Sequence, residues 1–243
     1  MTTLSVVSLF PSLLNVNGDA ENGDVLAARA RWAGLEAMHL RIEEVGALPV
    51  EPDVIVLGSG TDASAEAALE RIAPLQDELR RWATEGVPIL GVGTGMELLG
   101  WGIEFADGRT LEGLGIVPGR AVPREARVSD DLIVRSKHGL LVGYENHARD
   151  YVGAEGSPLG RVVRGSGNGR GSGQEGVVMG SVIGTHLHGP VLAKQPALAD
   201  AMLAATAERR GVAYATGGPA AEADGYADRA RAVILERLGV SGR

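Results

Sequence analysis

The segment Pro88–Gly100, which reads Pro-Ile-Leu-Gly-Val-Gly-Thr-Gly-Met-Glu-Leu-Leu-Gly, constrains the fold of this chain more than any other. An apolar run typical of a buried strand passes through closely spaced glycines into a stretch typical of a helix. A strand, a tight turn and a helix in this order present a nucleophile at the carboxyl end of a strand. Here the turn position is Gly93, and the 243-residue chain contains no cysteine. The sequence therefore predicts the geometry of a nucleophile-bearing turn that lacks a thiol.

The first half of the chain alternates short β-branched runs with amphipathic stretches, which indicates strands linked by crossover helices. Val54–Leu57 is an unbroken apolar run, as expected for a strand of a parallel sheet covered on both faces. We predict an α/β fold with a mixed, mostly parallel sheet and helices on both faces. The predicted strands are 4–10, 38–45 and 53–57, and the predicted helices are 23–35 and 62–84, the latter capped by Asp62 and interrupted at Pro74.

The second half has shorter strands and more glycine turns, and we expect its strands to extend the same sheet. These strands are 117–128, 132–134, 140–144, 160–163, 176–179 and 182–188. The glycine-rich stretch 164–174 is predicted to be a hairpin tip rather than a phosphate-binding loop, because no helix begins after it. Helices are predicted over 196–210 and 220–238. We assign residues 1–212 to one domain and residues 213–243 to a linker and a C-terminal helix packed on or beside it.

Composition excludes several functions. The formal net charge is -8 and the basic residues are scattered, which argues against nucleic acid or an anionic membrane as the main partner. No apolar run approaches the roughly 20 residues that a membrane span needs, and no secretory leader is recognisable, so we expect a cytoplasmic protein. Without cysteine, thiolate metal sites and disulfides are also excluded.

Two glycine loops, Gly58–Gly60 and Gly91–Gly95, follow neighbouring strands and should meet at the carboxyl edge of the sheet, where α/β folds bind ligands. Backbone N–H groups in such loops suit a developing oxyanion, although each loop alone is equally explained as a tight turn. His188, within Gly184–Pro190, is placed to act as a general base at this edge, or to serve a structural role. His186 and His188 lack a third ligand at a suitable spacing, so we predict no metal site.

These motifs together resemble the GatD-type glutamine amidotransferase subunits of lipid II isoglutaminyl synthase, which are related to cobyric acid synthase, over nearly the whole chain. The segments that carry the resemblance are Leu13–Asp19 with Asn22, Glu112–Ile116, Gly143–His147, Gly165–Asn168 with Glu175–Gly176, and Gly184–Pro190. The resemblance implies a class I, triad-type glutaminase fold. It also implies that His188 stands where the family has its catalytic base and that Arg127 stands where the family has an arginine implicated in binding glutamine.

The remaining candidate positions surround the glycine loops. We expect a concavity there whose ligand-binding residues are Gly58, Gly60, Thr94, Glu97, Arg127 and Asn146. The family resemblance implies a partner of the Mur-ligase type, called MurT in the peptidoglycan system, which would use ATP and Mg²⁺. No cofactor is expected in this chain itself.

The sequence departs from the family where catalysis takes place. The family turn Cys-Gly-Gly-Tyr-Gln is replaced by Gly93–Glu97, and the family segment Asp-Arg-Glu-Gln is replaced by Asp62–Ala65. Thr94 is next to the turn position and could be considered as a replacement nucleophile. Because it lies one residue further along the turn, its side chain should point away from the position of the lost nucleophile. Because several pocket positions have changed together, we infer natural loss or repurposing of the site rather than a single inactivating substitution.

Three functions remain open at this point. The favoured hypothesis is a catalytically degenerate GatD-like subunit that no longer hydrolyses glutamine and pairs with the Mur-ligase-like partner as a structural or regulatory subunit. The first alternative is a repurposed enzyme that acts on another amide or ester through His188 and the glycine loops. The second alternative is a sensor that binds a small amino acid.

Overall fold

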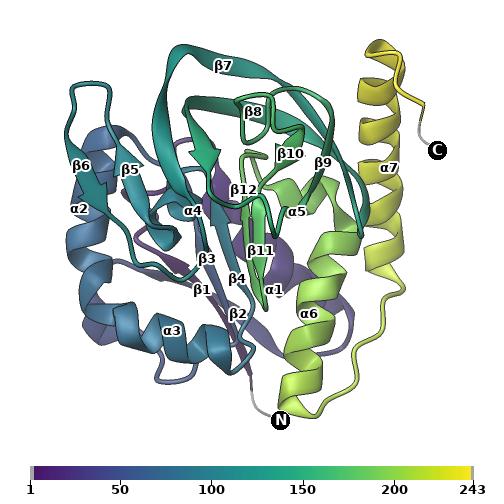
Figure 1. Cartoon of the computed structure of the whole chain (residues 1–243). Helices are drawn as coiled ribbons and strands as arrows, with labels where there is room; N and C mark the ends of the chain where they lie inside the picture. Colours follow the sequence, from purple (N-terminus) through teal and green to yellow (C-terminus); the bar gives the residue numbers. More distant parts are fainter. Residues whose placement is uncertain (1–2, 242–243) are drawn as a thin grey trace.

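The computed structural model describes residues 3–241 and is built around a six-stranded sheet (Figure 1). Its strand order is β11-β12-β4-β3-β1-β2, and all neighbours are parallel except β11, which runs antiparallel to β12. The strands are β1 (Leu4–Leu9), β2 (Ala37–Ile42), β3 (Val54–Leu57), β4 (Ile89–Val92), β11 (Val177–Met179) and β12 (Val182–Thr185). The predicted mixed, mostly parallel sheet is confirmed.

Helices cover both faces of this sheet, and the alternation of side chains along β3 shows why. Ile55 and Leu57 pack into the core shared with α2 (Asp62–Ile72) and α3 (Gln76–Thr84). Val54 and Val56 point to the opposite face and pack into the core shared with α1 (Asn22–Trp32) and α6 (Pro196–Arg210). A strand buried on both sides needs apolar residues at every position, which is the unbroken run seen in the sequence.

The expectation that the second half extends this sheet is wrong for most of its strands. Only β11 and β12 join the parallel sheet, and the others form a second six-stranded sheet ordered β10-β9-β7-β5-β6, with β8 paired to β7. Its strands are β5 (Gly102–Glu104), β6 (Thr110–Glu112), β7 (Arg120–Ser136), β8 (Gly139–Val152), β9 (Gly160–Arg164) and β10 (Gln174–Glu175). The long β7–β8 hairpin carries its own antiparallel partners, so it forms a separate layer instead of adding to an edge.

An irregularity in β7 matters for the site. Pro123 and Val128 of β7 pair with Arg149 and His147 of β8. The two paired positions are therefore five residues apart on β7 but only two residues apart on β8. The extra residues bulge out of the ladder, as expected for strands that turn a side chain toward a functional region. The predicted strands 117–128 and 132–134 are thus parts of one bulged strand. The glycine-rich stretch 164–174 joins antiparallel β9 and β10, which confirms the hairpin prediction.

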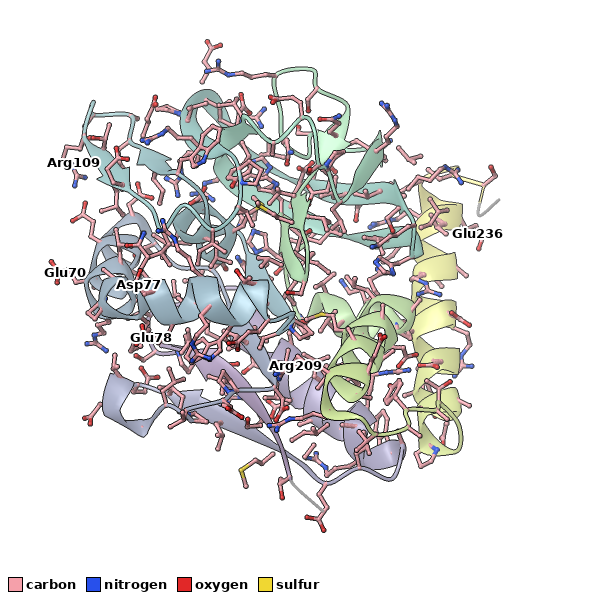
Figure 2. All side chains as sticks on the ribbon, turned by 60° about the horizontal axis from the view of Figure 1, so that its bottom comes forward. Glu70, Asp77, Glu78, Arg109, Arg209 and Glu236 are labelled. Atoms are coloured by element: carbon pink, nitrogen blue, oxygen red, sulfur yellow. The ribbon has the colours of Figure 1, made fainter. Side chains whose placement is uncertain are left out.

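Helix boundaries follow the sequence closely, with one correction. The predicted break at Pro74 is confirmed, because a 3-10 turn over Ala73–Leu75 separates α2 from α3. Charged residues of both helices, including Glu70 and Asp77, point outward (Figure 2). The predicted cap at Asp62 is wrong. Thr61 is the N-cap of α2, since it has extended backbone geometry and its Oγ1 accepts the Ser64 N–H at 3.2 Å. None of the helices within residues 3–241 combines the length and apolar character that a bilayer span requires.

The C-terminal helix α7 (Pro219–Arg237) lies along one side of the molecule (Figure 1), where it contacts α1 and α5 (Val191–Lys194). A buried cation holds it there. Arg29 of α1 donates to Asp224 of α7 at 2.6 Å and makes a two-point contact with Asp200 of α6 at 2.7 and 2.8 Å. Burial disfavours the charged guanidinium, but the two carboxylates outweigh it and raise the pKa of Arg29. One side chain therefore connects three helices.

Replacement of Arg29 by Met is expected to lower the free energy of unfolding by about 2–4 kcal/mol, because it leaves two carboxylates without their shared cation. Urea denaturation followed by circular dichroism measures this change. Arg229→Met, on the exposed side of α7, is the matched control and should change stability by less than about 0.5 kcal/mol. Equal effects of the two substitutions would contradict the role assigned to Arg29.

Candidate functional site

The turn between β4 and α4 (Thr94–Leu99) has the geometry predicted from the sequence. Gly93 adopts φ 53° and ψ -116°, a conformation that residues with a Cβ rarely adopt. Its N–H donates to the Thr185 carbonyl at 2.9 Å, and its carbonyl accepts the Glu97 N–H at 3.0 Å. The turn is thereby fixed between β12 and the first turn of α4.

The two glycine loops are neighbours, as predicted. The Gly95 N–H donates to the Gly58 carbonyl at 2.9 Å, and a Cβ on Gly95 would lie only 2.3 Å from the Leu57 carbonyl oxygen. Thr94 Oγ1 accepts the Gly60 N–H at 3.1 Å and donates to the Gly60 carbonyl at 3.0 Å. The Thr94 hydroxyl is therefore turned away from the apex of the turn and occupies a backbone donor of the neighbouring loop.

His188 faces the apex of the turn. A Cβ built on Gly93 would lie 2.6 Å from His188 Cε1 and 3.4 Å from Nε2, so the imidazole fills the space beside the glycine. His188 Nδ1 lies 3.2 Å from Asp19 Oδ2, while the buried Nε2 has no hydrogen-bond partner within residues 3–241. Asn17 Nδ2 also lies 3.1 Å from Nδ1, but this amide donates to Ser59 Oγ, whereas the Asp19 carboxylate can only accept. We therefore assign the proton to Nδ1 and a lone pair to Nε2.

Asp19 is the acidic residue behind this histidine, and the sequence analysis did not assign it a role. Its carboxylate is fully buried and also accepts the Ser59 hydroxyl and, at 2.9 Å, the Gly189 N–H. Asn17 donates to Ser59 Oγ at 3.0 Å, which extends the network toward the surface. The motif Leu13–Asp19 was visible in the sequence, but its 169-residue separation from His188 concealed the contact.

A cavity of about 400 Å³ opens at this edge between the glycine loops and the second sheet. Seven of the eight predicted site residues line it, namely Gly60, Gly93, Thr94, Glu97, Arg127, Asn146 and His188. Gly58 does not line the cavity and lies behind it, where its carbonyl holds the turn. Arg127 sits in the β7 bulge and donates to Asn146 Oδ1 of β8 at 2.7 Å, so the bulge brings this arginine to the cavity.

Arg149 of β8 also lines the cavity, and the sequence did not predict it as a site residue. Its Nε and Nη2 each donate to a different oxygen of Glu97 at 2.9 Å, and its Nη1 donates to Asp62 at 2.8 Å. Burial disfavours the charged guanidinium, but Glu97 and Asp62 outweigh it and raise the pKa of Arg149, which stays cationic. Because side chains alternate along a strand, Arg149 shares a face with His147, and that period-2 pattern could have identified it.

A second buried cluster lies against the cavity wall. The rings of His147 and His186 are stacked with centroids 4.3 Å apart. His147 Nε2 lies 3.0 Å from Glu145, and His186 Nδ1 lies 3.0 Å from Glu175. His186 and His188 therefore face different carboxylates. Burial of Glu175 would raise its pKa, but His186 and the surrounding hydrogen-bond donors lower it below the usual value of about 4.5.

Comparison with known proteins agrees with this architecture. Residues 7–196 match the CobB/CobQ-like glutamine amidotransferase domain, and the chain belongs to this family. The chain is 29% identical over 241 residues to the GatD subunit of the glutamine-hydrolysing lipid II isoglutaminyl synthase of Staphylococcus aureus. This alignment covers 98% of this chain and 97% of the relative. The corresponding subunit of Streptococcus pneumoniae is 26% identical over 204 residues and covers 81% of this chain and 77% of its own.

Solved structures show the same fold. The structure of PurLQS from Thermotoga maritima aligns with a TM-score of 0.54 at 18% identity and covers 86% of this chain and 97% of that chain. A glutamine amidotransferase from the same organism aligns with a TM-score of 0.53 at 14% identity and covers 98% and 96%. The fold predicted from the sequence, that of a class I glutamine amidotransferase, is confirmed.

Replacement of Gly93 by Ala is expected to lower the free energy of unfolding by about 1–3 kcal/mol, because the new Cβ meets the His188 ring and the backbone keeps a positive φ. Thermal and urea denaturation measure the loss. Gly46→Ala is the control, since no atom lies within 4 Å of its added Cβ, and it should change stability by less than about 0.5 kcal/mol. A neutral Gly93→Ala would show that the ring can move aside freely.

Replacement of Glu175 by Gln is expected to cost stability in a pH-dependent manner. The folded-state pKa of Glu175 is lowered, so its contribution is fully present above about pH 4.5 and is lost as the pH falls through that lowered pKa. Urea denaturation of the parent and the variant between pH 3 and 7 should show a difference that is largest at neutral pH and shrinks in acid. Glu236→Gln, at the exposed end of α7, is the control, and a parallel pH profile for both substitutions would contradict the assignment (Figure 2).

Proposed function

We propose that this chain is a GatD-like subunit that has given up glutamine hydrolysis and supports a MurT-type, Mur-ligase-like partner as a structural or regulatory subunit. The partner would form an amide bond with ATP and Mg²⁺, and the reaction would belong to peptidoglycan synthesis in the cytoplasm. The observation that carries this proposal is Gly93, which places no side chain at the apex of the turn in front of His188 Nε2.

Three further observations support the loss of hydrolysis. The chain has no cysteine, so no thiolate can form an acyl-enzyme at this turn. The His188 ring lies where a side chain on residue 93 would begin. The Gly60 N–H already donates to Thr94, so the neighbouring loop is not arranged as a free oxyanion donor. We therefore regard His188 as a vestigial base whose position is kept by Asp19.

Retention of a subunit role is supported by the extent of the similarity. The Staphylococcus aureus relative is described as a subunit of lipid II isoglutaminyl synthase, and the alignment with it runs almost from end to end of both chains. We propose that the surface that contacts the ligase has been kept and that the ligand-binding residues are Gly60, Thr94, Glu97, Arg127 and Asn146, with Gly58 supporting them.

The test is to purify the chain together with the Mur-ligase-like protein of the same organism and to measure amide formation with glutamine or with ammonium salts. We expect amidation with ammonium that depends on this chain, no amidation with glutamine, and no release of glutamate. The GatD subunit of Staphylococcus aureus with its own partner serves as the positive control for glutamate release. Glutamine-dependent amidation accompanied by glutamate release would overturn the proposed loss, and failure to co-purify would overturn the proposed subunit role.

A further inference from the structure

Two guanidinium groups reach the same cavity from different strands of the second sheet, Arg149 from β8 and Arg127 from the bulge of β7. From their partners we propose that the cavity binds a small dicarboxylate, with one carboxylate on Arg149 and the other on Arg127. This ligand class differs from a neutral amide. The inference rests on the proposed function in one respect only, namely that the bound molecule is not hydrolysed.

Arg149 has one permanent partner and one replaceable partner. Glu97 is 4% exposed and holds the Nε and Nη2 edge through two hydrogen bonds of 2.9 Å, which fixes the orientation of the guanidinium. Asp62 is 58% exposed and holds only Nη1. An exposed ion pair contributes little, and Asp62 regains water when it leaves. A ligand carboxylate can therefore take the place of Asp62 at small cost.

Arg127 is an exposed residue whose described partner is uncharged. It donates one hydrogen bond, to Asn146 Oδ1, and a guanidinium has five N–H donors. A carboxylate placed beside it gains a charge-assisted hydrogen bond without displacing a competing anion from that contact. The hydrogen bond to Asn146 holds Arg127 beside β8, the strand that carries Arg149.

The charges favour an anion over an amide. Arg127 and Arg149 balance Asp62 and Glu97 along the cavity lining, and Asp19 is buried behind His188. When Asp62 turns to solvent, Arg127, Arg149 and Glu97 together leave one positive charge. L-glutamate, with a net charge of about -1 at pH 7, neutralises that charge, whereas L-glutamine, with a net charge of about zero, does not. An arginine that points into a binding site lowers the affinity for an amide relative to a carboxylate of the same shape, because the amide cannot form the ion pair. The cavity should therefore separate glutamate from glutamine, although the two differ by one polar group.

Isothermal titration calorimetry of the full chain at pH 7 tests the proposal with glutarate, L-glutamate and L-glutamine as ligands. We expect glutarate and L-glutamate to bind at least about tenfold more tightly than L-glutamine, and no glutamate to be released from glutamine. Equal affinity for L-glutamate and L-glutamine, or no heat from either dicarboxylate up to about 10 mM, would overturn the binding proposal. Glutamate release would instead contradict the proposed function, so the two failures are distinguishable.

Four variants assign the contacts. Arg127→Met should weaken dicarboxylate binding at least about tenfold, and Asp62→Asn should strengthen it several-fold because the competing carboxylate is gone. The double variant with Arg149→Met and Glu97→Gln removes the crossing ion pair without leaving a buried charge, and it should bind the acid and the amide equally. Arg164→Met, outside the cavity, should leave the affinity unchanged. Weaker binding by Asp62→Asn, or a retained preference in the double variant, would overturn the assignment, with thermal melts confirming that each variant is folded.

Discussion

The buried carboxylate of Asp19 is the contact on which the geometry of this site depends. It accepts hydrogen bonds from the segment after β3, through Ser59, and from the segment after β12, through His188 and Gly189. Asp19 itself follows β1, so one side chain connects the ends of three parallel strands. A carboxylate with no access to water needs these donors, and the donors in turn lose their positions without it. The edge of the sheet is therefore ordered before any ligand arrives.

The second sheet adds the other wall and changes the character of the cavity. Through Arg149 it contributes a cation that donates to Glu97 of α4 and to Asp62 of α2. Glu97, in the first turn of α4, and Arg149 of β8 depend on each other, since Glu97 would be a costly buried charge without Arg149. The glycine apex at Gly93 and the ion pair of Glu97 with Arg149 thus line the same cavity.

The sequence predicted those parts of the molecule that depend on local pattern. The apolar run of β3, the turn at Gly93 and the helix 196–210 were all recognisable because their signals lie within a few residues. The second sheet was missed because strand pairing is non-local, and the bulge of β7 split one strand into two apparent ones. The cap at Thr61 was misplaced by one residue, since threonine and aspartate both serve as caps.

The site shows the same division. Five of the predicted residues line one cavity because the glycine loops and His188 follow strands that end at the same edge. Arg127 and Asn146 reach that cavity from β7 and β8 of the second sheet. Asp19 and Arg149 were missed because their partners lie 169 and 52 positions away in the sequence. The alternation along β8 places Arg149 on the same face as His147, but it does not show that Arg149 is paired with Glu97.

The attachment of α7 has a consequence for how the molecule opens. Ala220 and Ala227 are the residues of this helix that are buried, and its other anchors are arginine contacts such as Arg29 with Asp224. Polar anchors demand precise alignment yet bury little apolar surface, so the free energy that separates the docked helix from a detached one is smaller than that of the sheet core. Detachment of α7 is thus expected to cost less free energy than unfolding of the parallel sheet that carries the cavity.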